Sequence, residues 1–382
     1  GMIRYFTAGE THGPVLTAII EGRPAGVYVS ADRINAQLAL RQRGFGRGGR
    51  MKIETDKVEI LSGVRAGFTT GAPVTLAIKN RDFENWRHIT GAYAVSDERR
   101  VICPRPGHAD LAGAMKYAHT DMRNVLERAS ARETAVRVAA GALIRAVGEM
   151  FGMEFFSRVV SIADVADEDA VHDADFYARV YESDVGFGSE SSAKKAREAI
   201  TAAGKSGKTL GGVVEVTVRG VVPGLGSYAQ YDRKLDARLA GALMSIQAIK
   251  GVEIGLGFKA AQSIGGAALD EIFYDGKYRR KTNNAGGIEG GMSNGEDIVV
   301  RAAMKPIPTQ TSPLESVDIT TKKTADAASE RSDVCAVAAC ACVAENIAAV
   351  EIVNAFLEKF GADTAEDMRA SFDAYKKRLE SF

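Results

Sequence analysis

The spacing of hydrophobic and polar positions divides the chain into strands and helices. Short alternating or apolar runs predict strands over residues 2–8, 14–21, 58–63, 73–79, 155–161, 211–220 and 252–258. Apolar residues three and four positions apart, such as Val136, Ala139, Ala140 and Leu143, predict helices. Helices are expected from Ala131 onward, over 192–203, 232–249 and 330–359, and Gly361 is expected to end the last of these. The chain should therefore mix α and β structure.

Polar residues mark the starts of several predicted helices. Asp32 is expected to cap a helix that runs to Leu40, and Asp363 to cap the final helix. Ser130 and Glu133 fit a capping box, which would start a helix at Ala131. Asp110 is the expected cap of a helix that carries Leu111, Met115, Ala118 and Met122. Residues 162–190 are acidic and are expected to be irregular and peripheral.

Composition and charge narrow the class of protein. The 382 residues are 46% hydrophobic, which is enough for a large core, and 49 basic residues balance 49 acidic ones. A neutral chain implies no nucleic-acid partner, and without a run of eighteen apolar residues no membrane span is expected. The N-terminus lacks a signal pattern, so a cytoplasmic location is expected, and Gly1 before Met2 is typical of an expression-tag remnant.

The four cysteines predict neither disulfides nor a metal site. Cys103, Cys335, Cys340 and Cys342 are too few and too irregularly spaced for a disulfide framework. A zinc site would need a second ligand pair, and no histidine lies near Cys340 and Cys342. Buried free thiols are therefore expected, and no metal is predicted.

The stretch from Arg105 to Thr134 concentrates histidine, arginine and helix-start signals. A turn at Pro106 and Gly107 should present His108, whose ordinary pKa near neutrality suits a proton donor, although a lone histidine is more often structural. Arg128 and Arg132 flank the helix start at Ser130, where free backbone N–H groups favour a phosphate or carboxylate. An ordinary capped surface helix would show the same pattern, so both interpretations stay open on this evidence.

Glycine-rich loops supply three further candidate sites. The loop Gly9-Glu10-Thr11-His12-Gly13 exposes a hydroxyl and an imidazole, although it could be only a hairpin turn. The loop 41–50 carries Arg41, Arg43, Arg47 and Arg50, whose forked donors suit an anionic small molecule. Residues 282–295 could approach a ligand through backbone amides or form a plain surface loop. The loop 80–100, with Trp86 and His88, is expected to be a plain connection, although a lid is the alternative.

Residues 202–209 nearly match a nucleotide-binding P-loop, but the match is rejected. The first required glycine is Ala202, and a predicted helix precedes the loop while a predicted strand follows it. A P-loop needs the opposite order, so no ATP site is expected.

Taken together, the motifs resemble the chorismate synthase family over nearly the whole chain. They are GETHG (9–13), RGFGRGGR (43–50), RPGHAD (105–110), RASARETAVRVAAGA (128–142), TNNAGGIEGGMSNG (282–295), MKPIPT (304–309) and ERSD (330–333), in the family's order. Thr11 and Ala129 stand where the family usually has serines, and Val334 and Ala338 stand where prolines are common. The resemblance implies one domain over 1–382, of the α+β class: a β-α-β sandwich with helices packed between antiparallel-rich sheets, usually assembled as a homotetramer.

The resemblance also implies an activity and its residues. The family converts 5-enolpyruvylshikimate 3-phosphate to chorismate by trans 1,4-elimination of phosphate, the last step of the shikimate pathway, and it requires reduced FMN without net redox change. His12 would protonate the departing phosphate and His108 would protonate or stabilise the reduced flavin. Asp333, assisted by Thr11, would help the flavin accept the C6 proton. The residues implied to hold the substrate's anions are Arg41, Arg47, Arg50, Arg105 and Arg132.

The FMN contacts implied by the same motifs are Arg128, Ala129, Ser130, Gln247, Ala248, Gly290, Lys305, Pro306, Ile307, Pro308, Thr309 and Arg331. Whether the chain reduces its own flavin with NADPH or depends on a separate reductase stays open. Two other hypotheses compete with the elimination. A flavin oxidoreductase would use the same FMN contacts, but no dinucleotide fingerprint follows a predicted strand. An RGG-type RNA-binding module is ranked last, because the arginine tract is short and sits in a neutral chain.

Overall fold

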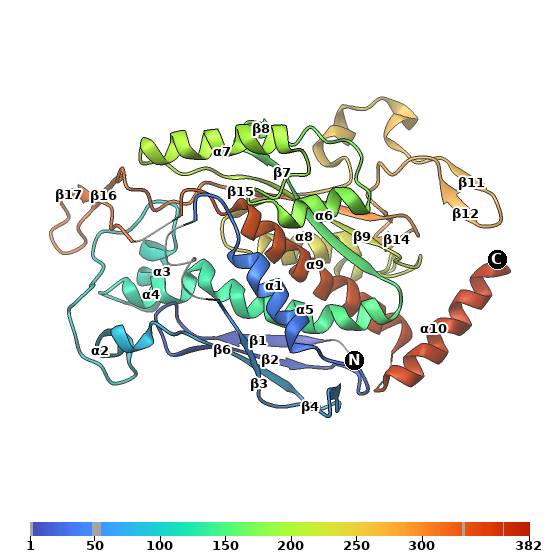
Figure 1. Ribbon diagram of the computed structural model, residues 1–382, viewed down its shortest axis with the longest axis horizontal. Helices are drawn as coiled ribbons and strands as arrows, with labels where there is room; N and C mark the ends of the chain where they lie inside the picture. The colour runs from blue at the N-terminus through green and yellow to red at the C-terminus, as the bar shows by residue number, and fades with distance from the viewer. Residues whose placement is uncertain (1–2, 48–54, 331–332, 362) are drawn as a thin grey trace.

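Two antiparallel sheets enclose a layer of helices in the computed structural model, which describes residues 3–47, 55–330, 333–361 and 363–382 (Figure 1). The first sheet has the order β1-β2-β6-β3, from strands Arg4–Ala8, Val15–Glu21, Val74–Lys79 and Val58–Ile60. The second has the order β10-β15-β9-β7-β8, from Ile249–Ile254, Ile298–Met304, Gly212–Arg219, Glu154–Ile162 and Val165–Ala166. This arrangement confirms the predicted α+β sandwich.

The helical layer supplies most of the core. Helix α5 (Thr134–Met150) packs against β2 and β6 of the first sheet and against helix α9 (Val337–Phe360). Helix α9 in turn packs against β7 and β9 of the second sheet, while α1 (Ala31–Gln42) and α8 (Leu235–Met244) flank the pair. Because α9 touches other elements on all sides, its sequence is apolar all round rather than on one stripe.

Helix α9 is long and apolar enough to pass a test for a membrane span. Its 24 residues include an 18-residue window with a mean hydropathy of 1.6. However, 94% of that window is buried inside the protein. Between the two sheets, α9 acts as the central core helix.

The remaining elements lie around this sandwich. Helices α6 (Ala174–Glu182) and α7 (Glu190–Lys205) cover the outer face of the second sheet, and α10 (Ala365–Glu380) follows α9 (Figure 1). Short helices α2 (Arg87–Thr90), α3 (Asp110–Tyr117) and α4 (Arg123–Ala129) lie together at one end of the sandwich. The small hairpins are β4-β5 (Val64–Arg65, Phe68–Thr69), β11-β12 (Ile272–Tyr274, Tyr278–Arg280), β13-β14 (Ile288–Glu289, Met292–Ser293) and β16-β17 (Glu315–Val317, Thr324–Asp326).

Three of the predicted helix caps are wrong, by one or two residues. Ser30, not Asp32, caps α1, because its side chain accepts a hydrogen bond from the Arg33 backbone N–H. Thr364, not Asp363, caps α10 by accepting from Asp367 N at 3.0 Å. Asp110 lies inside the first turn of α3, and its carboxylate binds Arg105 instead of a free helix N–H group.

The stretch 105–134 forms shorter helices than predicted. The expected helix from Asp110 through Met122 stops at Tyr117, because Ala118 adopts a left-handed conformation with φ 57°. The capping box is confirmed only in part. Ser130 does cap the helical segment that starts at Ala131, by accepting from Arg132 N, but Ala131–Glu133 is a 3-10 turn. The Glu133 carboxylate binds Thr7 and Gln247 instead of the Ser130 N–H. Helix α5 therefore begins at Thr134.

Boundaries were also misplaced in the second half. The predicted helix from Glu330 begins only at Val337, so residues 330 and 333 precede it rather than forming its first turn. The predicted helix 232–249 is confined to Leu235–Met244, and the following strand is Ile249–Ile254 rather than 252–258. The region 162–190 is not wholly irregular, since it contains α6, against which His172 stacks through Phe176.

Candidate active site

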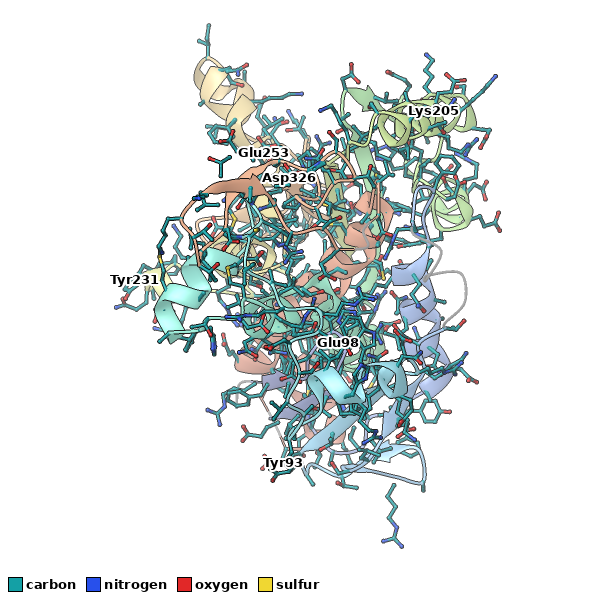
Figure 2. The ribbon with its side chains drawn as sticks, turned by 90° about the vertical axis from the view of Figure 1, so that its left-hand side faces the viewer. Tyr93, Glu98, Lys205, Tyr231, Glu253 and Asp326 are labelled. Atoms are coloured by element: carbon teal, nitrogen blue, oxygen red, sulfur yellow. The ribbon has the colours of Figure 1, made fainter. Side chains whose placement is uncertain are left out.

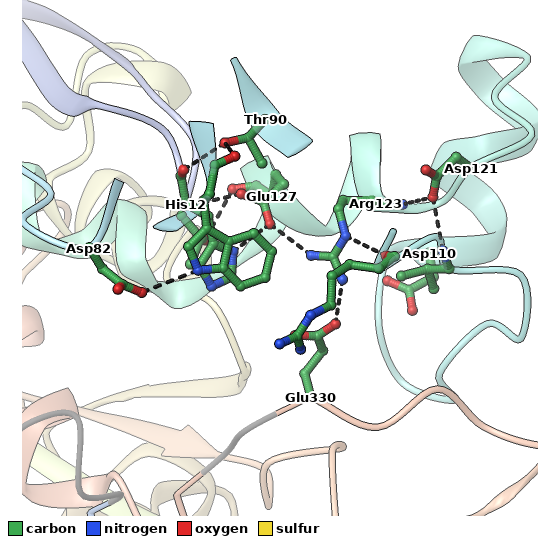
Figure 3. Close-up of polar contacts among 12 residues, drawn as sticks. His12, Asp82, Thr90, Asp110, Asp121, Arg123, Glu127 and Glu330 are labelled. Atoms are coloured by element: carbon green, nitrogen blue, oxygen red, sulfur yellow. Dashed lines mark hydrogen bonds and ion pairs between the residues drawn. The ribbon is translucent and has the colours of Figure 1, made fainter. Parts of the chain in front are cut away.

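His12 sits in a buried polar cluster built by the first hairpin and α4. The loop between β1 and β2 places His12 against Glu127, whose carboxylate accepts from the imidazole Nδ1 and from the His12 backbone N–H, both at 2.7 Å (Figure 3). His12 and Glu127 are only 8% and 5% exposed. Thr11 is tied to the same residue, since its N–H and its hydroxyl both donate to the Glu127 carbonyl. The GETHG loop is therefore docked on α4 rather than being only a hairpin turn.

The only tryptophan of the chain covers one face of His12. The rings of Trp86 and His12 stack with centroids 3.7 Å apart and planes 16° apart. Asp82 orients the indole by accepting from its N–H at 3.2 Å, and the Thr90 hydroxyl donates to the His12 carbonyl. Trp86, Asp82 and Thr90 thus belong to the candidate site, so the loop 80–100 is more than the plain connection that was predicted. Figure 2 shows the face that carries this loop, with Tyr93 and Glu98 marked.

Arg123 links the His12 cluster to the segment before α9. Its guanidinium donates to Glu127 at 3.0 Å and to Glu330 at 2.7 Å, and its Nε donates to the Arg99 carbonyl (Figure 3). Burial raises the pKa of Glu127, but hydrogen bonds from His12 and the charges of His12 and Arg123 outweigh it and lower the pKa overall. Glu127 is therefore an ionised carboxylate at neutral pH.

A second cluster gathers three of the predicted anion-binding arginines. Arg132 makes a bidentate pair with Asp56, at 2.7 and 3.0 Å, and Arg41 Nη1 lies 3.9 Å from the same carboxylate. Arg47 donates through Nε to Asp333 at 2.7 Å. Arg123 of the His12 cluster binds Glu330, which is three residues before Asp333, so the Cα atoms of Glu330 and Asp333 are at most roughly 11 Å apart.

Among the described residues, the side chains of the arginine cluster carry more positive than negative charges. Three guanidiniums face two carboxylates, and both Arg41 Nη1 and Arg132 Nε are buried without a hydrogen-bond partner in the described part of the chain. Burial, together with the nearby Arg132 and Arg47, lowers the pKa of Arg41 to about 9. Unpaired buried donors and surplus positive charge are what a phosphate or carboxylate would satisfy. The cluster therefore fits an anionic ligand.

A third cluster forms around Arg105, which is buried. Its guanidinium makes a bidentate pair with the fully buried Asp110, at 2.9 and 3.0 Å, and donates to the Thr309 hydroxyl at 3.0 Å. His108 lies on the turn between them, with Nε2 3.4 Å from the Thr309 hydroxyl. Lys305 donates to the Gly107 carbonyl of the same turn. The sequence motifs at 105–110 and 304–309 therefore meet in space.

His108 is held in its neutral form. Burial is the largest cause that lowers its pKa, to about 4, and the charges of Arg105 and Lys305 act in the same direction against the weaker influence of Asp110. At neutral pH the imidazole therefore carries no net charge, and an anion bound beside Arg105 and Lys305 would favour its protonation.

Most of the predicted FMN contacts adjoin these clusters. Exposed Arg128 donates to the Thr7 hydroxyl, which in turn donates to Glu133, and Glu133 also accepts from Gln247 at 3.0 Å. Gln247 Oε1 is buried without a partner in the described residues, and Ala248 accepts from the Lys305 backbone N–H at 2.9 Å. The other predicted contacts lie at the end of α4 and in the segment after β15: Ala129, Ser130, Pro306, Ile307, Pro308 and Thr309.

Gly290 lies apart from two other predicted FMN contacts, Gln247 and Ala248, within this chain. The turn between β13 and β14 meets the start of α8, where Leu235 N donates to the Gly291 carbonyl. Gln247 and Ala248 follow the other end of that helix, which at ten residues is about 15 Å long. Arg50 and Arg331 lie outside the described residues. No group of three His, Cys, Asp or Glu side chains suited to a metal occurs in residues 3–47, 55–330, 333–361 and 363–382.

The sequence did not reveal the contacts of four residues that build the site: Asp56 with Arg132, Trp86 with His12, Glu127 with His12, and Glu330 with Arg123. Glu127 was overlooked because its partner His12 lies 115 residues away. The one available signal was that Glu127 and Arg123 are four residues apart and so share one helix face, beside a histidine-bearing loop.

Comparisons with known proteins agree with these motifs. The profile of the chorismate synthase family matches residues 3–357. Proteins named chorismate synthase from Pelobacter propionicus and Geobacter metallireducens are 54% and 53% identical to this chain, and each alignment covers both chains completely. A crystal structure of a chorismate synthase superposes with a TM-score of 0.82 at 39% identity, covering 100% of this chain and 99% of the other.

Proposed function

Because this chain belongs to the chorismate synthase family, we propose that it converts 5-enolpyruvylshikimate 3-phosphate to chorismate by trans 1,4-elimination. In that reaction the C3–O bond to phosphate breaks, a proton leaves C6, and a new double bond forms without net oxidation. The observation that carries the proposal is the acceptor-poor arginine cluster beside the His12–Glu127 pair. A phosphate and two carboxylates on the substrate match that excess of buried donors.

Arg41, Arg47 and Arg132 would bind the anionic groups of the substrate, with Arg105 and the residues outside the described part, Arg50 among them, completing the set. His12 would give its proton from Nε2 to the departing phosphate, because Nδ1 is engaged by Glu127. Asp333 accepts a hydrogen bond from Arg47. Assisted by the hydroxyl of Thr11, it would help to remove the proton from C6. These residues would bind the substrate by matching its negative charges and would orient it before any bond breaks.

Reduced FMN is proposed as the cofactor, and when bound it supplies the electron-rich ring that lets the elimination proceed. The residues that fit it are those along Thr7, Arg128, Gln247, Ala248 and Lys305, where the buried Gln247 Oε1 lacks a partner in the described chain. Such an acceptor suits a ring N–H donor, and Arg128 and Lys305 suit the phosphate. His108, with its neutral imidazole, would stabilise the reduced cofactor by taking up a proton. We also propose a single domain, a homotetrameric assembly and a cytoplasmic location, in keeping with a metabolic lyase.

An anaerobic assay tests the proposal. Purified protein, 5-enolpyruvylshikimate 3-phosphate and chemically reduced FMN are mixed, and chorismate absorbance and released phosphate are followed together. Equal amounts of both, formed only with reduced flavin, are expected. If FMN binds but neither product forms, while NADPH is oxidised steadily without substrate, the chain is a flavin oxidoreductase instead.

A further inference from the structure

The buried carboxylate of Glu127 makes more contacts with His12 than a simple counter-ion needs. It receives the ring Nδ1 on one oxygen and the backbone N–H of the same residue on the other, both at 2.7 Å. The Glu127 carbonyl also holds Thr11, the neighbour of His12. Glu127 therefore fixes the position of the loop, the orientation of the ring and the nitrogen that faces α4.

These contacts determine which imidazole nitrogen carries which role. An ionised carboxylate only accepts hydrogen bonds, so Nδ1 must carry a hydrogen. In the described part of the chain Nε2 makes no hydrogen bond, and the Trp86 stack prevents the ring from tilting. The nitrogen left for chemistry is therefore Nε2, and a proton there makes the ring a cation that Glu127 stabilises.

The charges around the His12–Glu127 pair both favour and oppose protonation of His12. Arg123 shares Glu127 with His12, and Glu330 in turn takes the other end of Arg123. The Arg99 guanidinium lies over the Trp86 ring, 5.2 Å from its centroid, and Asp82 accepts from the indole N–H. Arg123 and Arg99 oppose a proton on His12, whereas Glu127 is the only one of these carboxylates that contacts the imidazole. Its removal should have the largest effect on the charged form.

We propose that Glu127 is a positioning residue that holds His12 in the proton-carrying form with Nε2 directed at the reacting groups, and that Trp86 locks this orientation. The proposal rests on the proposed elimination, in which His12 supplies the proton to phosphate. Glu127 itself need not touch the substrate.

The stacked Trp86 offers a readout that needs neither substrate nor flavin. A protonated imidazole quenches an adjacent excited indole more strongly than a neutral one, and Trp86 is the only tryptophan. Emission of the flavin-free protein should therefore rise as His12 loses its proton with increasing pH. In Glu127→Gln the side chain keeps its size but loses the charge and one of its two acceptor oxygens. This rise should therefore move to lower pH by roughly one unit or more.

A matched control is the exposed His88–Glu98 pair on the same loop. Its Nε2–Oε2 distance of 2.9 Å gives the same type of contact without stacking on Trp86. Glu98→Gln should leave both the emission curve and turnover unchanged. His12→Gln should abolish the pH-dependent step in emission, which identifies its source.

The kinetic arm is a double-mutant cycle. Glu127→Gln should lower kcat by about tenfold or more, with KM changed less than about threefold, because the group acts on the proton donor rather than on binding. In the His12→Gln background the same change should cost less than about twofold. If Glu127→Gln does not fold, Glu127→Asp, which keeps the charge but shortens the reach to Nδ1, should show the same loss of kcat.

An emission curve unchanged in Glu127→Gln overturns the proposal, as does an equal loss of kcat in both backgrounds. Failure of the elimination assay with a displaced emission curve has a different meaning. In that case Glu127 does position His12, and only the proposed reaction is wrong.

Discussion

Arg132 and Asp56 form a buried bidentate ion pair, with Nη1–Oδ2 and Nη2–Oδ1 distances of 2.7 and 3.0 Å. The pair ties the turn before α5 to the segment before β3, 76 residues earlier in the chain. Since Arg41 also approaches this carboxylate, at 3.9 Å, Asp56 pairs with two buried guanidiniums. It stabilises in the free protein a cluster that an anion would stabilise in the complex.

Asp56→Asn should destabilise the protein and make its stability depend on anions. Removing one partner of a buried pair leaves uncompensated charge, at a cost of about 3–5 kcal/mol. Inorganic phosphate should recover part of the loss, measured as Tm against sodium chloride at equal ionic strength. Glu59→Gln, which breaks the exposed pair with Lys79, is the control and should cost less than about 1 kcal/mol. A phosphate effect equal in both variants would contradict the assigned role of Asp56.

The fold class and the main strands could be predicted because they depend on local pattern. Alternation over 2–8 and 14–21 is a direct consequence of a sheet with one face on the core, and the structure has β1 and β2 there. Helix starts were missed where two polar residues compete. Ser30 lies one residue before α1 and Asp32 inside its first turn, and only the backbone geometry decides which side chain reaches a free N–H.

The site was predictable only in part, because its residues came from motifs and its pairings depend on tertiary structure. His12, Arg105 and Arg132 were identified individually. Glu127, the partner of His12, and Asp56, the partner of Arg132, were not identified, since nothing local signals a contact across 115 or 76 residues. Ala118 shows the same limit in a helix: its left-handed backbone splits α3 from α4, although alanine favours helices.

The thiols provide a test of the core. Burial raises the pKa of Cys335 to about 11 and of Cys340 and Cys342 to about 12, so these thiols should be inert in the native protein. Cys103 is half-buried. A disulfide reagent should therefore label at most one thiol per native chain and four after denaturation, and Cys103→Ala should remove the native labelling. Rapid native labelling of two or more would contradict the packing of α9.

Two helical glycines make a matched pair for the contact between α5 and α9. A Cβ at Gly141 would lie 2.5 Å from the Asn346 carbonyl oxygen on α9, whereas a Cβ at Gly241 in α8 would meet nothing within 4 Å. Gly141→Ala should lower the free energy of unfolding by about 1–3 kcal/mol through overpacking. Gly241→Ala should raise it by roughly 0.5–1 kcal/mol through helix propensity. Urea denaturation measures both, and equal effects would mean that the helices are not in close contact.

His108 should make the protein lose stability in mild acid. Burial and the nearby Arg105 and Lys305 lower its pKa from 6.5 to about 4 in the folded state, so between these values the unfolded chain binds a proton that the folded chain does not. The contribution of neutral His108 is fully present above pH 6.5 and is lost as the pH falls toward 4. His108→Asn should therefore lose less stability than the wild type between pH 6.5 and 4, measured by urea unfolding at several pH values. His88→Asn, which removes an exposed imidazole, controls for the loss of a histidine. Parallel curves for the wild type and His108→Asn would show that the folded protein does not lower the pKa of His108.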